Sequence, residues 1–201
     1  MILVVCALPQ ELRYLDRRSG IDIFVCGVGP VESGIRVAAR LAAQRYDAVV
    51  NAGIGGAFRG RAQIGDALLI VRDTFADFGL EGGGALALPP GTLVESATSD
   101  AALIARCSPT SLPLGRAITV TAVTATAATG TRLASRYDAD VESMEGFAIL
   151  RAAELAATPA IEVRGISNYV GERASSGWDF GAGARATADA LERILDALLV
   201  R

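Results

Sequence analysis

The sequence predicts an α/β fold in which a single β-sheet carries helices on both of its faces. Short runs of apolar and β-branched residues alternate along the chain with longer segments whose apolar residues recur three and four positions apart. A length of 201 residues suits one domain, and a hydrophobic content of 51% against 20% charged residues excludes a disordered chain. We therefore expect one three-layer domain over residues 1–201.

The amino-terminal part of the chain is predicted to alternate strands with helical segments. Runs rich in Val, Ile and Leu predict strands at 2–7, 21–28, 47–51 and 65–71. A short helix is expected to begin at Glu11. Residues 31–44 have helical spacing, with an apolar stripe at Ile35, Ala38, Ala39 and Ala42. The run 52–56 is expected to be a glycine-rich turn that brings backbone amides against a ligand.

The same alternation continues to the carboxyl terminus. Residues 75–91 hold three consecutive glycines and a Pro-Pro pair, so they are expected to form a loop, either a lip over a site or a surface loop. Further strands are expected at 118–124, at the start of 140–148, and at 160–166. Further helices are expected at 101–107, 126–137, 147–156 and, at the end of the chain, up to Val200.

Charge and hydropathy exclude several classes of partner. The net charge is −3 and the chain has no basic cluster, which argues against nucleic acid and against an anionic membrane surface. No apolar run reaches the roughly 18 residues of a membrane span, and the first residues lack the full pattern of a secretory signal. We therefore expect a cytoplasmic protein with a small-molecule partner.

The cysteines and the missing histidine limit the chemistry. Cys6, Cys26 and Cys107 are widely spaced and odd in number, which suggests unpaired thiols in a reducing compartment. Because the chain has no histidine, Ser-His-Asp and Cys-His catalysis and most zinc sites are excluded. Acid–base work then falls to carboxylates, tyrosine or water, and no metal or cofactor is expected.

Three acidic residues crowd the junction of a predicted strand and helix: Asp140, Glu142 and Glu145. In open α/β sheets, ligands sit at the carboxyl ends of strands. A carboxylate there can accept two hydrogen bonds from a vicinal diol, such as the hydroxyls of a ribose. Glu145 can instead complement the helix dipole, and the residues alone leave both interpretations open.

Four strand ends have unusual polar or glycine content and can converge at one edge of the sheet. They are Glu11, the glycines of 53–56, Met144-Glu145 and Ser167-Asn168. These four places define the candidate site.

An ordered set of motifs spans nearly the whole chain. The set comprises Ala7-Leu-Pro-Gln-Glu11, Gly27-Val-Gly29, Asn51-Ala-Gly-Ile-Gly-Gly56, Glu142-Ser-Met-Glu-Gly146 and Arg164-Gly-Ile-Ser-Asn-Tyr-Val-Gly-Glu-Arg173, followed by Trp178. With it the sequence resembles the nucleoside phosphorylase and nucleosidase superfamily, related to the methylthioadenosine/adenosylhomocysteine nucleosidases. The last motif points to the futalosine hydrolase branch.

The resemblance implies a fold and a reaction. The fold would be a nucleoside phosphorylase-like α/β/α sandwich with a central twisted mixed β-sheet. The reaction would be hydrolysis of the N-glycosidic bond of futalosine, which releases hypoxanthine and dehypoxanthine futalosine in menaquinone biosynthesis by the futalosine pathway.

The resemblance also implies roles for individual residues. Glu11 would be the base that activates the hydrolytic water, because a weak nucleophile must lose its proton as positive charge develops at the anomeric carbon. An exposed place in the first turn of a helix is the alternative for Glu11. Glu145 would bind the ribose diol and Met144 would pack under the sugar, although a methionine can equally fill the core. The backbone at Gly55 and Gly56 would lie near the sugar and the water.

By the same resemblance, Ser167 and Asn168 would handle the purine base. Related adenine-specific nucleosidases carry aspartate where this chain has Asn168. An amide can donate to a six-oxo oxygen but cannot protonate the base, so Asn168 favours hypoxanthine over adenine and leaves the proton source to a water relay. A mismatched base would leave a buried group unsatisfied, at a cost of about 1–3 kcal/mol. A helix N-cap is the alternative role for Asn168.

The remaining matches have two interpretations each. The region of Thr124 would bind the base or cap the next helix. Trp178 would cover the base or the distal aromatic part of the substrate, or would serve as interface or core. Ile54 stands where methylthioadenosine-type enzymes have serine, so the contact that this serine would make with the hydrolytic water is absent here. An arginine should meet the carboxylate of the futalosine side arm, and the candidates are Arg59, Arg61 and Arg173.

Other functions stay open at this point. One is another purine nucleosidase, acting on inosine, methylthioadenosine or amino-substituted futalosine. Another is a phosphorylase, which needs a cationic phosphate pocket for which Arg59, Arg61 and Arg72 are candidates by charge alone. The third is a catalytically inert nucleoside-binding protein. The resemblance also implies a homo-oligomer, a dimer or larger, with the site near a subunit boundary.

Overall fold

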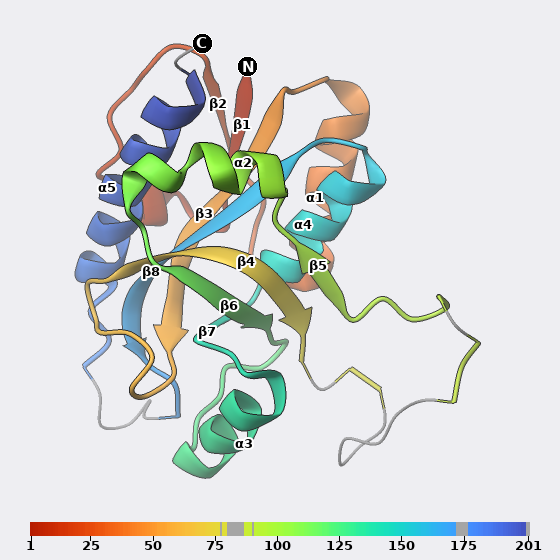
Figure 1. Ribbon diagram of the computed structural model, residues 1–201, viewed down its shortest axis with the longest axis vertical. Helices are drawn as coiled ribbons and strands as arrows, with labels where there is room; N and C mark the ends of the chain where they lie inside the picture. Colours follow the sequence, from red (N-terminus) through yellow and green to blue (C-terminus); the bar gives the residue numbers. More distant parts are fainter. Residues whose placement is uncertain (77, 80–86, 90, 172–176, 200–201) are drawn as a thin grey trace.

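The protein has the predicted α/β fold, built on one mixed sheet of eight strands (Figure 1). It is represented by a computed structural model that describes residues 1–76, 78–79, 87–89, 91–171 and 177–199. The strands are β1 Ile2–Cys6, β2 Ile21–Val25, β3 Ala48–Ala57, β4 Ala67–Phe75, β5 Ser96–Thr98, β6 Leu114–Thr119, β7 Val141–Ser143 and β8 Ala160–Tyr169.

The strand pairing places three carboxyl ends side by side. β1 pairs in parallel with β2 and β3, and β3 pairs in parallel with β8. β8 then runs antiparallel to β4, which pairs in parallel with β6, and β6 pairs in parallel with β7. β7 in turn pairs antiparallel with β3. Strands β3, β8, β4, β6 and β7 therefore form a closed ring of paired strands. The ends of β1, β3 and β8 therefore open toward the same region.

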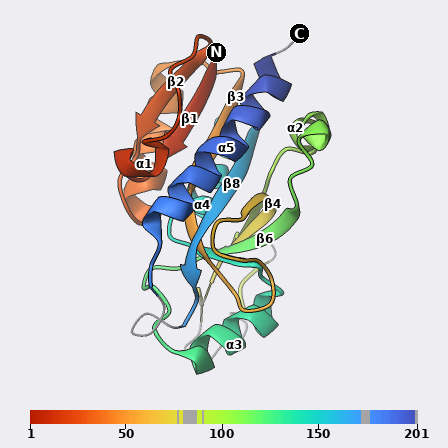
Figure 2. The same ribbon diagram turned by 90° about the vertical axis from the view of Figure 1, so that its left-hand side faces the viewer.

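Helices cover both faces of the sheet (Figures 1 and 2). They are α1 Pro30–Ala43, α2 Ala101–Arg106, α3 Ala127–Tyr137, α4 Gly146–Leu155 and α5 Phe180–Leu199, with 3₁₀ turns η1 Pro9–Leu12 and η2 Ser108–Thr110. β1 shows why the layers form, because its side chains alternate between the faces. Leu3 and Val5 pack with α1 and α4, whereas Ile2 and Val4 pack with α5.

The predicted apolar stripe of α1 was wrong. Ile35 is 64% exposed, and the three alanines of the stripe are exposed as well. The buried face instead carries Val37 and Leu41, and Gly34 brings the helix close to Ala148 of α4. Since an alanine buries little apolar area, the two larger side chains decide which face packs. An apolar stripe on α1 is left facing outward.

The glycine run 52–56 is not a turn, because β3 continues through it to Ala57. A Cβ at Gly53 would lie 2.4 Å from Arg164 Nη1, and one at Gly55 would lie 2.6 Å from Val141 Cγ1. The glycines therefore allow close packing inside a strand. β8 also extends further than predicted and includes Asn168, which excludes a helix N-cap role for that residue.

Other predictions had partial outcomes. β6 ends at Thr119 rather than at 124, and β5 was not predicted. The centre of the predicted loop 75–91, residues 80–86, lies outside the described residues, as does Arg173.

All three cysteines are free and buried, and burial raises the pKa of Cys6 and of Cys26 to about 12. The predicted unpaired state is confirmed, and burial disfavours the reactive thiolate at all three. None of the helices that the structure describes has the length and apolar content needed to cross a bilayer.

Candidate active site

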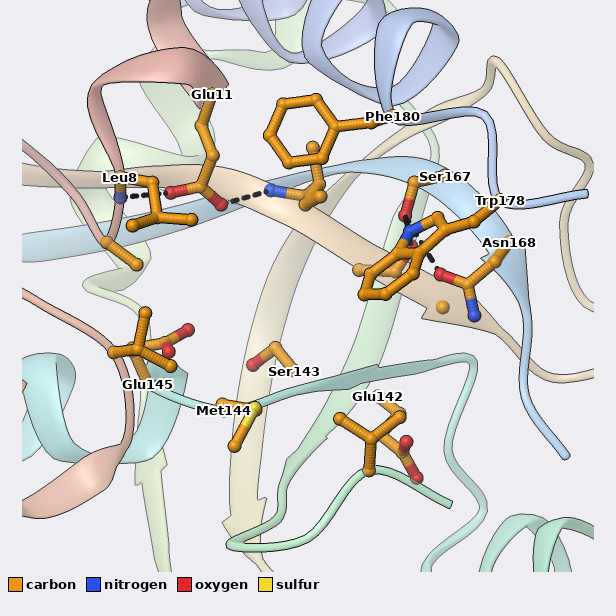
Figure 3. A pocket seen from close by; sticks show the side chains of 16 residues that line it. Leu8, Glu11, Glu142, Ser143, Met144, Glu145, Ser167, Asn168, Trp178 and Phe180 are labelled. Atoms are coloured by element: carbon orange, nitrogen blue, oxygen red, sulfur yellow. Dashed lines mark hydrogen bonds between the residues drawn. The ribbon is translucent and has the colours of Figure 1, made fainter. Parts of the chain in front are cut away.

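A cavity of about 170 Å³ opens where β1, β3 and β8 end, beside the junction of β7 and α4 (Figure 3). Eight of the predicted site residues line it: Glu11, Gly55, Gly56, Met144, Glu145, Ser167, Asn168 and Trp178. Thr124 does not line the cavity, although its neighbour Val123 does. Residues distant in sequence therefore meet around one space large enough for part of a nucleoside.

Glu11 is a buried carboxylate held by two backbone amides. It lies in η1, and only 4% of its surface is exposed. Leu8 N donates to Oε2 at 2.8 Å, and Ile54 N donates to Oε1 at 3.0 Å. The exposed helical position considered from the sequence is therefore wrong. Two fixed donors orient this carboxylate toward the cavity that it lines.

Glu145 faces the cavity from the opposite side. It precedes α4 but makes no side-chain cap, and its Oε1 instead accepts from Gly29 N at 2.9 Å. Gly29 adopts a φ of 90°, a conformation that favours glycine. Burial raises the pKa of Glu145, while the charge of Arg164 and the Gly29 hydrogen bond lower it. Figure 3 shows Glu11 and Glu145 across the same space.

A chain of hydrogen bonds fixes the side chain of Asn168. The Trp178 indole Nε1 donates to Ser167 Oγ at 2.8 Å, and Ser167 Oγ donates to Asn168 Oδ1 at 2.9 Å. Asn168 Nδ2 donates to the Tyr169 carbonyl at 3.2 Å. Because an indole can only donate, the Ser167 oxygen is its acceptor. The Ser167 hydroxyl has two acceptors in reach, Asn168 Oδ1 at 2.9 Å and the Gly55 carbonyl at 3.3 Å, and the contact with Asn168 is the shorter. Trp178 thus supports the amide and is 52% exposed at the cavity mouth.

Glu142 also lines the cavity, although the sequence analysis gave it no separate role. Its Oε1 accepts from Thr124 N at 3.0 Å. Its Oε2 is buried and has no hydrogen-bond partner among the described residues. Burial raises the pKa of Glu142, and hydrogen bonding from Thr124 lowers it. The signal was present in the acidic triplet, but the sequence does not say which of the three side chains points inward.

A buried charged cluster lies beneath the cavity floor and was missed. Arg164 Nε donates to Glu162 Oε1 at 2.7 Å, and both residues are 1% exposed or less. Asp73 accepts from Thr119 Oγ1 at 2.8 Å, and burial together with the charge of Glu162 raises its pKa well above the ordinary value. The sequence did contain a signal for this cluster. Glu162 and Arg164 are two positions apart within the apolar run 160–166, so their side chains lie on the same face of the strand.

Arg164 links this cluster to the cavity. A Cβ at Gly53 would lie 2.4 Å from Arg164 Nη1 and 2.8 Å from Glu11 Oε1, so both side chains approach the same glycine. Burial opposes its charge, but Glu162, Glu145 and Glu11 raise its pKa above the ordinary value. The guanidinium is therefore a permanent cation under two cavity carboxylates.

Metal-binding geometry is not found in the described part of the chain, where no group of three or more His, Cys, Asp or Glu side chains could hold an ion. Of the candidate arginines, Arg59 and Arg61 do not line the cavity. Arg61 pairs with Asp138 at 2.8 Å, and Arg59 stacks on the Tyr169 ring at 4.8 Å.

Comparisons with known proteins show the family to which this chain belongs. The family model described as the phosphorylase superfamily matches residues 17–200. A futalosine hydrolase from Streptomyces coelicolor is 34% identical over 197 residues, covering 89% of this chain and 80% of that protein. The Thermus thermophilus futalosine hydrolase is 29% identical, covering 88% of this chain and 82% of that protein.

Solved structures share the fold at lower identity. The native futalosine hydrolase of Helicobacter pylori has a TM-score of 0.83 at 18% identity, and 97% of each chain is covered. A Streptococcus pneumoniae 5′-methylthioadenosine/S-adenosylhomocysteine nucleosidase, solved with a transition-state inhibitor, has a TM-score of 0.83 at 22% identity, with 98% of this chain and 99% of that chain covered.

Proposed function

This chain belongs to the phosphorylase superfamily, and from that membership we propose that it hydrolyses the N-glycosidic bond of futalosine. The products are hypoxanthine and dehypoxanthine futalosine, in a step of menaquinone biosynthesis. Three relatives are futalosine hydrolases, and each aligns with most of this chain. They support futalosine as the substrate.

One observation carries the proposal: two buried carboxylates, Glu11 and Glu145, line opposite sides of the same cavity. Hydrolysis of a nucleoside needs a group that activates water on one face of the sugar. It also needs a group that holds the sugar. A purely structural acid has no reason to line a cavity when its burial is costly.

In the proposed mechanism, Glu11 accepts a proton from a water molecule as the water oxygen attacks the anomeric carbon. The two backbone donors to Glu11 hold the carboxylate still, which favours a productive angle of attack. The bond from the anomeric carbon to the base nitrogen breaks, and the electron pair leaves with the base. A positioned general base contributes about 10²–10⁴-fold to such a step.

Glu145 would accept hydrogen bonds from the ribose diol, and Met144 would support the sugar from below. Gly29 N orients one Glu145 oxygen, so the carboxylate plane is set before substrate arrives. Gly55 and Gly56 would give the sugar room against the strand backbone. These contacts would place the anomeric carbon between the two acids.

At the other end, Ser167, Asn168 and Trp178 would hold the purine. The hydrogen bonds that link Trp178, Ser167 and Asn168 fit a binding role for Asn168, whose amide can donate to a six-oxo oxygen. The proton that the leaving base requires would come through water, since an amide does not supply one.

Phosphorolysis has less support. The residues described around the cavity include neither Lys nor Arg, so no cationic side chain there is placed to hold a phosphate dianion. Glu11 and Glu145 would repel it. Base release that is unaffected by added phosphate is the expected result.

We further propose that the chain forms a homo-oligomer through the outward face of α1. Val31 is 71% exposed and Ile35 64%, and Val28 is half-exposed while also lining the cavity. A second copy on this surface would cover apolar area and close the cavity mouth. Light scattering on the purified chain, compared with an Ile35→Glu variant, tests the assembly.

The function is tested by incubating the purified protein with futalosine, its six-amino analogue, inosine and methylthioadenosine, with and without phosphate. Chromatography then reads the free base. Release of hypoxanthine from futalosine alone, without phosphate, is expected. Release of base only from another nucleoside, or only with phosphate, would reject the proposal.

A further inference from the structure

Two buried acids meet beneath the floor of the cavity. Asp73 of β4 and Glu162 of β8 are both closed to solvent. A Cβ at Gly146, the first residue of α4, would lie 2.8 Å or less from Asp73 Oδ2 and from both carboxyl oxygens of Glu162. The two carboxyl groups therefore converge on one point. Asp73 Oδ2 and Glu162 Oε2 have no hydrogen-bond donor among the described residues.

One proton would satisfy both of these oxygens. Two ionised carboxylates this close repel each other, and water cannot screen the repulsion because neither group is exposed. A proton on one acid turns its oxygen into a donor, and the oxygen of the other acid becomes its acceptor. The geometry therefore favours a pair of acids that holds one proton and one negative charge.

The neighbours of the pair place the proton on Asp73. Glu162 Oε1 accepts from Arg164 Nε at 2.7 Å, so a buried cation lies directly against Glu162. Asp73 Oδ1 instead accepts from a neutral hydroxyl, Thr119 Oγ1, at 2.8 Å. Burial and the charges of Glu162 and Glu145 raise the pKa of Asp73, while the Thr119 hydrogen bond and the charge of Arg164 oppose the rise. The negative charge therefore stays on Glu162, beside the cation.

The pair is connected to Glu11 through Arg164. Arg164 Nη1 and Glu11 Oε1 approach the same glycine, Gly53. The hydrogen bond from Nε to Glu162 fixes the guanidinium at that place. If Asp73 were ionised, a second buried anion would compete with Glu162 for the guanidinium. The place of Arg164 beside Glu11 then depends on the proton.

The other oxygen of Asp73 is connected to the start of α4. Thr119 Oγ1 donates to Asp73 Oδ1 and accepts from Phe147 N, both at 2.8 Å. Phe147 is the second residue of α4 and follows Glu145 by two positions. Gly146 lies between them, against the two acids. The buried pair is therefore linked to the carboxylates on both sides of the cavity.

We propose that Asp73 is a positioning residue that carries a proton and donates it in a hydrogen bond to Glu162, which holds Arg164 beside Glu11 and the start of α4 beside Glu145. Asp73 does not line the cavity, so it acts on the reaction only through these neighbours. The effect on base release rests on the proposed function, whereas the shared proton does not.

Paired variants test which acid holds the proton. Asp73→Asn replaces the protonated acid with an amide of the same shape, whose NH₂ donates to Glu162 and whose oxygen accepts from Thr119. Its kcat for futalosine should stay within about fivefold of the wild type. Glu162→Gln removes the anion that fixes Arg164 and should lower kcat by about 10–100-fold. The dissociation constant of futalosine should change by less than about tenfold in both variants.

Asp73→Leu separates the hydrogen bonds from the volume of the side chain. Leucine fills the same space but neither donates to Glu162 nor accepts from Thr119. Its kcat should fall by about 10–100-fold, as in Glu162→Gln. Thermal unfolding of each variant measures whether it folds.

Infrared difference spectroscopy detects the proton directly and needs no substrate. At neutral pH, the spectrum of the wild type minus that of Asp73→Asn should contain the carbonyl band of a protonated carboxylic acid. Glu154→Gln is the matched control, because Glu154 is an acid of α4 that pairs with Arg151 at 2.7 Å away from the cluster. Its difference spectrum should lack this band.

The outcomes separate this inference from the proposed function. If the wild type releases no base from futalosine, the proposed function fails, and the infrared band still decides where the proton lies. If Asp73→Asn removes a carboxylate band instead, does not fold, or lowers kcat as much as Glu162→Gln, the inference is overturned. A folded Asp73→Leu variant with the kcat of the wild type would also overturn it.

Discussion

Replacing Glu11 with Gln should remove turnover and leave substrate binding largely intact. The carboxylate accepts from both Leu8 N and Ile54 N, at 2.8 and 3.0 Å. A Gln amide has one oxygen, so it satisfies one of these donors and turns its NH₂ toward the other. The mismatch should cost about 1–3 kcal/mol of folding free energy. Loss of the base should lower kcat by about 10²–10⁴-fold, since an amide cannot take the proton of water.

The assay for Glu11→Gln measures three quantities on the same preparation. Chromatography of hypoxanthine gives kcat, calorimetry gives the dissociation constant of futalosine, and urea unfolding gives stability. The dissociation constant should change by less than about tenfold, because the lost interaction acts in the transition state. Glu32→Gln, at an exposed acid of α1, is the matched control. A kcat within a few-fold of the wild type would remove Glu11 from the mechanism.

Three further changes test other parts of the site. Asn168→Asp should shift preference toward six-amino purines, and unchanged six-oxo selectivity in the nucleoside panel would contradict this. Gly53→Ala places a methyl 2.8 Å from Glu11 Oε1 and should lower kcat at least about tenfold. Gly177→Ala should not, because its methyl would meet none of the described atoms within 4 Å. Asp73 has a raised pKa, so the folded state holds more protons than the unfolded state above about pH 4, and the free energy of unfolding falls as pH rises toward that pKa. Asp73→Asn should make the free energy of unfolding less dependent on pH above about pH 4, measured by urea unfolding at a series of pH values; an unchanged pH dependence would contradict it.

The alternation of strands and helices was enough to predict the layers, because buried strands and amphipathic helices have different periods. Which face of α1 is buried could not be predicted in the same way. Its outward side is nearly as apolar as its inward side, so periodicity gives two answers. Only the contact of Gly34 with Ala148 and the burial of Val37 decide between them.

The glycines of β3 show a second limit. From the sequence, Gly53 and Gly56 read as a turn, since glycine most often marks one. In the fold they are places where other side chains approach the strand: Arg164 at Gly53 and Asn168 at Gly56. Those neighbours lie more than a hundred positions away in the chain, and local pattern carries no information about them.

Most residues that line the cavity were named from the motifs, but their hydrogen-bond partners were not. Nothing in the spacing of the chain links Gly29 to Glu145, or Trp178 to Asn168. These contacts depend on which strand ends the fold brings together, and they determine which atoms are free to meet a ligand. Glu142 was therefore left without a role, although it stands in the same acidic triplet as Glu145.

The charges around the cavity favour hydrolysis over other uses of the same fold. Glu11, Glu142 and Glu145 line it, and Arg164 is the one buried cation among the described residues, placed beneath the floor and bonded to Glu162. In the proposed mechanism, positive charge grows on the sugar as the base departs, and carboxylates on both sides would stabilise it more in the transition state than in the substrate. A phosphate dianion entering the same space would meet like charge on each wall, whereas neutral water would not. In this proposal, the arrangement that would stabilise the cationic sugar would therefore also select the nucleophile.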